Sequence, residues 1–241
     1  MKNKPAGIRR LIRGMERSAL LSVICLAFAV AYPTAAFFGN GVLALIFRLM
    51  AGLAFVAVGV TSYIMGAKDG VYGKLVIAGL ALSAVAGVCL EIGAEWNIAA
   101  GIGIYVLGNI MYIAALACVN GFMPFQAAAG ALFGGAAAYY IWRAPWLAVG
   151  RLYPLAVLYF FMTAFTVGGA LCAAVRKKRE RLSEILFASG TVLLAAGSVV
   201  SLHIFFTDSG DMDAWNYAAS LLHCPGQICI GLSLMDEPAV R

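Results

Sequence analysis

The residues of this chain that could do chemistry are a few polar side chains inside long apolar runs. Within these runs lie one carboxyl, Glu91, one guanidinium, Arg48, and the imidazole of His223. A charge at the centre of a membrane helix costs roughly 2.5–3.5 kcal/mol, so such groups persist mainly where they face a partner or a cavity. Carboxyl and imidazole groups transfer protons in enzymes, and a guanidinium pairs well with phosphate. Each also has an ordinary interpretation, because Arg48 could reach outward to the interface and Glu91 could contact headgroups.

Neutral polar groups share this depth. Asn109, Ser198 and Gln227 could hydrogen-bond a ligand, or could equally join neighbouring helices. Gln227 follows His223 by four residues, so the two side chains lie on one face of a helix. His203 lies close to the end of its run and is expected to be an ordinary boundary residue. Together these residues indicate a polar cavity within the membrane.

The composition is that of an integral membrane protein. Hydrophobic residues make up 63% of the 241 residues and charged residues 12%, whereas soluble domains are about 25% charged. We expect one transmembrane domain over residues 18–235, preceded by a basic segment, 1–17, and followed by a short tail, 236–241. The net charge of +6 comes from basic terminal and loop clusters, as expected for the flanks of membrane helices, so we expect no nucleic-acid partner.

The apolar runs predict an all-α, polytopic membrane helix bundle with about eight transmembrane helices, since about 20 apolar residues span a bilayer. The expected spans are residues 18–38, 42–65, 74–93, 98–119, 125–142, 152–175, 185–206 and 215–235. The beginning resembles a signal peptide ending near Ala36, but the apolar run continues through Phe37 and Phe38, which favours retention of the first helix.

Lysine and arginine positions predict the orientation in the cell membrane. With a cytoplasmic N-terminus, 14 of the 17 basic residues fall in inner segments and two, Arg143 and Arg151, in outer ones. Eight helices then return the C-terminus to the cytoplasm, and the polar groups occupy the outer half of the bilayer. We expect the basic inner segments to contact anionic lipid headgroups. The oligomeric state does not follow from the sequence.

Common catalytic and metal-binding motifs are absent. No GxSxG, P-loop or HExxH pattern occurs, and the two histidines lack the spacing of a helical metal site. The six cysteines include no CxxC pair and are expected to be small buried residues. We therefore expect neither a metal nor a cofactor.

Five segments, in order and spacing, resemble motifs of the YhhN family, eight-span membrane proteins whose characterised members are lysoplasmalogenases. They are residues 47–55, with Arg48 where lysine is usual, 78–91, 108–112, 189–198 and 226–228. Tyr112 and Gln227 match the family pattern. Two family aspartates are replaced, one by Gly87 or Val88 and the other by Ser198, and the family histidine is replaced by Asn109.

The resemblance implies hydrolysis of the vinyl ether bond of lysoplasmalogen-type lipids, giving a fatty aldehyde and a glycerophospho-base. Because the family aspartates are replaced, Glu91 and His223 become the expected catalytic pair, and Arg48 is expected to hold the lipid phosphate. The other expected substrate-binding residues are Asn109, Tyr112, Ser198 and Gln227. The alternatives are a non-catalytic lipid-binding or structural relative and, less favoured, a small-solute transporter.

Overall fold

The computed structural model describes residues 6–66, 70–122, 124–144, 147, 149–176, 182–206 and 212–235, and these residues form an all-α structure. The helices are α1 (Ala6–Phe37), α2 (Gly41–Gly66), α3 (Val71–Ile92), α4 (Glu95–Asn120), α5 (Pro124–Arg143), α6 (Tyr153–Arg176), α7 (Leu182–Phe206) and α8 (Met212–Leu232). Two 3-10 turns, η1 (Gly150–Leu152) and η2 (Ser233–Met235), precede α6 and follow α8.

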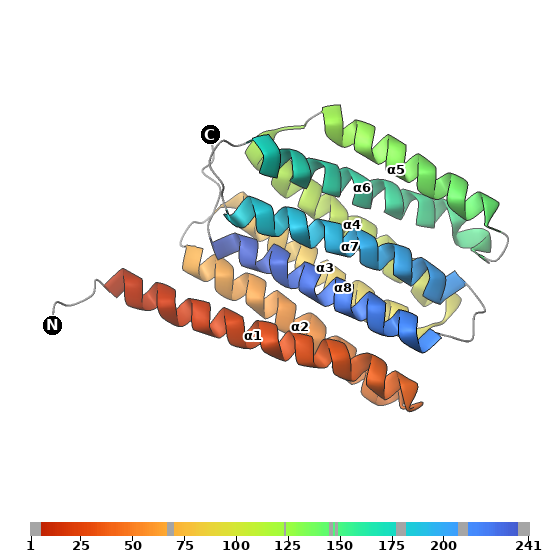
Figure 1. Ribbon diagram of the computed structural model, residues 1–241, viewed down its shortest axis with the longest axis horizontal. Helices are drawn as coiled ribbons and strands as arrows, with labels where there is room; N and C mark the ends of the chain where they lie inside the picture. The colour runs from red at the N-terminus through yellow and green to blue at the C-terminus, as the bar shows by residue number, and fades with distance from the viewer. Residues whose placement is uncertain are drawn as a thin grey trace.

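The eight helices run side by side along the long axis of the molecule, and successive helices are antiparallel (Figure 1). Helices α2, α3, α4, α6, α7 and α8 pack in that order, and α8 closes the ring against α2. Helix α1 packs on the outside against α2 and α8, and α5 packs mainly against α6. The start of α1 and the end of α8 lie at the same end of the bundle.

The expected spans match the helices closely, with two differences. Helix α1 begins at Ala6, twelve residues before the expected span, because the helix continues beyond its apolar part. Of the eight described helices, seven are long and apolar enough to cross a membrane, and α5 is the exception. Its sequence is rich in alanine and glycine, which contribute little hydrophobic surface compared with leucine or isoleucine. The predicted membrane helix bundle is confirmed, and α5 is the described helix that falls short of a membrane span.

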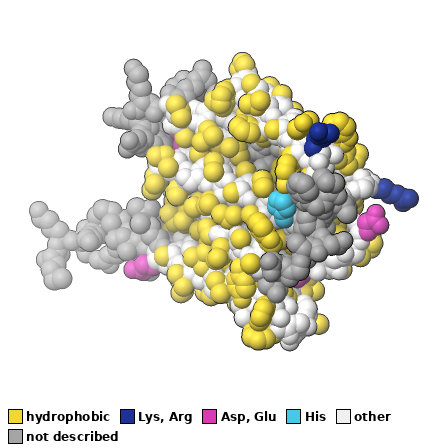
Figure 2. Space-filling model, turned by 45° about the vertical axis from the view of Figure 1, so that its right-hand side comes forward, with side chains coloured by type: hydrophobic (Ala, Val, Ile, Leu, Met, Phe, Trp, Pro, Cys, Tyr) yellow, Lys and Arg dark blue, Asp and Glu magenta, His cyan; other side chains and the backbone are white. Residues whose placement is uncertain are grey.

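The surface is that expected of a multi-pass membrane protein. Hydrophobic side chains cover the flank of the bundle, and the charged side chains visible on this face lie toward its two ends (Figure 2). The basic N-terminal side chains through Arg13, together with Lys68 and residues 176–181, lie outside the side chains that the structure describes. Their contact with anionic headgroups therefore stays a prediction.

A proline within α1 explains how this helix is held against α8. Pro33 has no N–H to donate to the carbonyl of Ala29 four residues earlier. The Ser220 hydroxyl of α8 donates to that carbonyl instead, at 2.6 Å. One turn away, Tyr217 Oη and Thr34 Oγ1 are 2.7 Å apart. These contacts place α1 at the edge of the site described next.

Helices α7 and α8 approach closely at a pair of glycines. A Cβ atom on Gly190 would lie 2.6 Å from the carbonyl oxygen of Gly226. Backbones in membrane bundles come this close only where both residues are small. This crossing holds α7 and α8 close together, and residues of both helices line one pocket.

Candidate functional site

A pocket opens at the end of the bundle where α1 joins α2, α3 joins α4 and α7 joins α8. It contains about 830 Å³ of space not filled by atoms, including its opening. Seven helices contribute to it, since its lining includes residues from α1, α2, α3, α4, α6, α7 and α8. Four of the predicted site residues line it: Arg48, Glu91, Ser198 and His223. The sequence therefore identified residues from four separate helices that the fold brings together.

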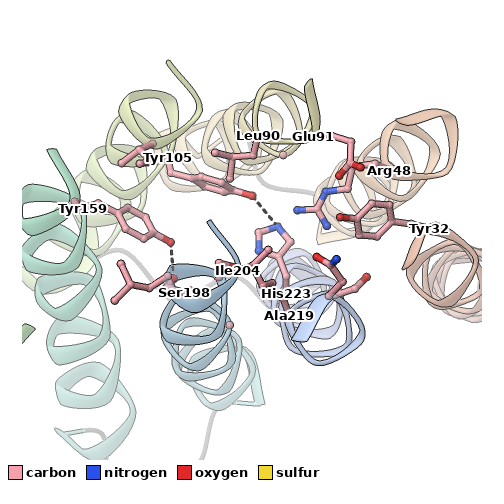
Figure 3. A pocket seen from close by; sticks show the side chains of 18 of the residues that line it. Tyr32, Arg48, Leu90, Glu91, Tyr105, Tyr159, Ser198, Ile204, Ala219 and His223 are labelled. Atoms are coloured by element: carbon pink, nitrogen blue, oxygen red, sulfur yellow. Dashed lines mark hydrogen bonds between the residues drawn. The ribbon is translucent and has the colours of Figure 1, made fainter. Parts of the chain in front are cut away.

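Arg48 occupies the charged end of the pocket. Its guanidinium lies over the ring of Tyr32, with Cζ 5.3 Å from the ring centroid, a distance suited to a cation–π contact. Figure 3 shows Arg48 between Glu91 and His223, with Tyr32 beside it. The guanidinium also interacts electrostatically with Glu91. A negatively charged ligand group entering this end would meet a guanidinium already held by aromatic and acidic neighbours.

Glycines at two positions fix this arrangement. Gly87 packs directly against Arg48, because a Cβ on that glycine would lie 3.0 Å from Nε and 3.1 Å from Nη2. Gly93 ends α3 with a φ of 76°, a conformation that glycine adopts without strain, and its N–H donates to the Leu90 carbonyl at 3.2 Å. The helix end therefore leaves Glu91 at the mouth of the pocket.

His223 forms the centre of the pocket. Its Nε2 lies 3.3 Å from the hydroxyl of Tyr105, and either group donates according to the imidazole tautomer. The rings of Tyr105 and Phe55 meet the imidazole edge-on, with centroids 5.6 and 6.2 Å away. These three contacts hold the ring in one orientation, as a proton-transferring imidazole requires.

Ser198 lies on the far side of the pocket, on α7. Its hydroxyl donates to the Leu194 carbonyl of the preceding turn at 2.7 Å. Its single proton is thus used, so the neighbouring Tyr159 hydroxyl must donate to Ser198 Oγ. Figure 3 shows this pair across the pocket from Arg48.

The lining becomes apolar around this second pair. Ile102, Ala156 and Leu202 line the pocket there and belong to a buried hydrophobic cluster that extends toward the end of α5. The pocket therefore has a charged end near α1, α2 and α3, and an apolar end among α4, α6 and α7.

Asn109, Tyr112 and Gln227 do not line this pocket. The Asn109 amide donates to the Tyr105 carbonyl at 3.1 Å and to Thr163 Oγ1 at 3.3 Å. The Tyr112 hydroxyl donates to Gln227 Oε1 at 2.9 Å, in a fully buried contact between α4 and α8. These residues lie deeper in the bundle and join helices, so any effect they have on a ligand passes through their neighbours.

Three pocket tyrosines were not singled out from the sequence: Tyr32, Tyr105 and Tyr159. Because tyrosine is common at membrane interfaces, a tyrosine deeper in a span does not stand out in the sequence. Tyr105 lies seven residues before Tyr112 on one helix face, and this spacing was the available signal. His203, in contrast, stacks on Trp215 with ring centroids 5.5 Å apart and does not line the pocket.

Within the described ranges, no three His, Cys, Asp or Glu residues lie close enough to hold a metal ion. No curated protein and no solved structure matches the chain. The model of the YhhN family matches residues 18–234, which include every helix that lines the pocket. By this match over most of its length, the chain is a multi-pass membrane protein of the YhhN family.

Proposed function

We propose that this protein hydrolyses the vinyl ether bond of lysoplasmalogen-type lipids, giving a fatty aldehyde and a glycerophospho-base. The observation that carries the proposal is the pocket itself, in which a guanidinium, a carboxyl and an imidazole meet beside an apolar wall within a YhhN family bundle. The pocket has a charged end at Arg48 and Glu91 and an apolar end at Ile102 and Leu202. Its two unlike ends suit a single-chain amphiphile.

The charged end suits the headgroup and the apolar end suits the alkenyl chain. Arg48 would hold the lipid phosphate through paired N–H donors, which is the geometry that arginine offers to phosphate. The chain would then extend past Tyr159 toward Ile102 and Leu202. In this pose the vinyl ether, which joins the two parts of the lipid, lies near the middle of the pocket and His223.

The reaction needs one proton donor and one base. Glu91 would donate a proton to the alkenyl carbon that is not bonded to oxygen, leaving an oxocarbenium-like carbon at the ether. Water would add there while His223 takes its proton. In the resulting hemiacetal, His223 would return a proton to the ether oxygen as its C–O bond breaks, and Glu91 would accept the hydroxyl proton. Aldehyde and alcohol leave, and both residues regain their starting protonation states.

The test measures aldehyde released from lysoplasmalogen by the purified protein in lipid nanodiscs. We expect Glu91→Gln to lower kcat by about 10²-fold or more, the usual contribution of a general acid. Glu95→Gln is the matched control, because Glu95 lies four residues away, at the start of α4, and does not line the pocket. Absence of aldehyde above that from nanodiscs without protein would overturn the proposal.

The alternative is a lipid-binding protein without hydrolytic activity. It is favoured by one observation, that Glu91 is the single carboxyl among the described residues lining the pocket. The same nanodiscs distinguish the two, since retention of a lysolipid without release of aldehyde supports binding alone.

We also propose that the pocket end faces outward, with both termini in the cytoplasm and the basic segments against anionic headgroups. The excess of lysine and arginine in the segments at the opposite end supports this orientation. Single cysteines placed in the α1–α2 and α7–α8 turns should react with a membrane-impermeant maleimide added outside intact cells. Labelling only after the cells are broken would reverse the orientation.

A further inference from the structure

A second, smaller cavity adjoins the pocket and extends toward the interior of the bundle. It contains about 190 Å³ of space not filled by atoms, including its opening. Arg48, Gly87 and His223 line both cavities, whereas Phe55, Ser83 and Cys224 line the smaller one alone. The two spaces therefore share Arg48 and His223, both of which the proposed reaction uses.

The smaller cavity has the polar partners that a bound water molecule requires. A buried water makes about three hydrogen bonds, typically to polar groups that would otherwise lack partners. Arg48 offers N–H donors, Ser83 offers a hydroxyl oxygen that can accept a hydrogen bond, and His223 lines the same space. Ser83 itself is 3% exposed.

The polar residues behind this cavity hold its wall in place. Tyr112 interacts with Ser83 and donates to Gln227, which is one helical turn from His223. Tyr112 also packs against Gly79, where an added Cβ would collide with its ring. Tyr112 and Gln227 do not line the main pocket. Through these contacts they support residues that line the smaller cavity.

We propose that the smaller cavity binds a water molecule between Arg48, Ser83 and His223, and retains it when a lipid fills the main pocket. An alkyl chain entering the main pocket displaces the water there, because apolar surface and water separate. Hydrolysis nevertheless consumes one water for each lipid. A water held beside His223 remains available where the two cavities meet.

The role of this water rests on the proposed hydrolysis, but its presence does not. During the reaction its oxygen would bond to the carbon that carries the ether oxygen, and one of its protons would pass to His223. The hemiacetal then breaks as described above, so no oxidant, reductant or further reactant is needed. Bulk water would refill the cavity after the products leave.

Radiolytic hydroxyl footprinting tests the site without relying on activity. Radicals formed from a bound water oxidise the side chains that contact it, so Phe55 and Cys224 should be labelled although they are only 2% and 1% exposed. Ser83→Val fills the cavity, and Ser83→Ala removes one partner without adding volume. Losing one hydrogen bond should lower the occupancy, and hence the labelling, by about tenfold.

Ser62→Val is the matched control, because Ser62 is fully buried on α2, its hydroxyl has no hydrogen-bond partner, and it lines neither cavity. It should leave the labelling of Phe55 unchanged. Labelling of Phe55 no greater than that of Leu80, a fully buried residue lining neither cavity, would overturn the proposal, after allowance for their intrinsic reactivities. Labelling that persists in both Ser83 variants would also overturn it.

A saturated-ether lysolipid, which cannot be hydrolysed by this route, tests whether the water is retained. With this lipid bound, labelling of Phe160 in the main pocket should fall while that of Phe55 stays. Equal loss at both positions would overturn the retention. If the wild-type protein releases no aldehyde but Phe55 is labelled, the proposed function fails and the water site stands.

Discussion

Adding one methyl group at Gly87 should weaken lipid binding by displacing Arg48. The Cβ of Gly87→Ala would lie 3.0 Å from Nε and 3.1 Å from Nη2, closer than nearly all Cβ contacts. The guanidinium must therefore shift by a few tenths of an ångström. A hydrogen bond to a charged group contributes about 1.5–3 kcal/mol, and 1.36 kcal/mol corresponds to a factor of ten. A partial loss at the low end of this range raises KM by about tenfold.

The assay compares KM and kcat for lysoplasmalogen, and the affinity for a saturated-ether analogue, in nanodiscs. Because Arg48 would hold the phosphate in both the ground state and the transition state, KM should rise while kcat changes little. Gly135→Ala is the control, since nothing lies within 4 Å of the added Cβ. It should leave KM unchanged and stabilise α5 by about 0.5–1 kcal/mol. An unchanged KM and analogue affinity in Gly87→Ala would refute the role of Arg48.

Two further substitutions test the supporting contacts through the thermal unfolding of the protein in nanodiscs. Tyr112→Phe removes the donor to Gln227 and leaves the buried amide oxygen without a partner, which should destabilise the protein by about 1–3 kcal/mol. Ser220→Ala removes the donor to the Ala29 carbonyl, which Pro33 cannot replace because it has no N–H. This change should lower the free energy of unfolding by about 1 kcal/mol. An unchanged unfolding temperature in either variant would contradict the contact concerned.

Much of this fold follows from apolar length alone. A bilayer requires helices of about 20 apolar residues, so the apolar runs identified every long helix and most helix ends within a few residues. Helix α1 begins twelve residues before the expected span. Hydropathy identifies the apolar part of a helix, whereas the helical hydrogen bonds continue into the polar segment before it. The packing order could not be predicted, because close approach at pairs such as Gly190 and Gly226 depends on which helices face each other.

The candidate site was only partly predictable, because depth along a helix does not determine the direction of a side chain. Arg48, Glu91, Ser198 and His223 were identified by polarity and depth, and all four reach the pocket. Asn109 has a similar depth, but it turns toward Thr163 and Thr166 of α6 and is satisfied there. Whether a polar side chain lines the cavity or contacts another helix depends on where the neighbouring helix lies, and the sequence does not predict that position.

Tyrosines position the polar residues of this pocket, which contains few charged groups. A phenol places a hydroxyl inside an apolar span without the cost of a charge, while its ring packs with hydrophobic neighbours. Tyr105 orients His223, Tyr32 supports the guanidinium of Arg48, and Tyr159 satisfies Ser198. Each phenol thus holds a residue that the sequence had suggested for chemistry.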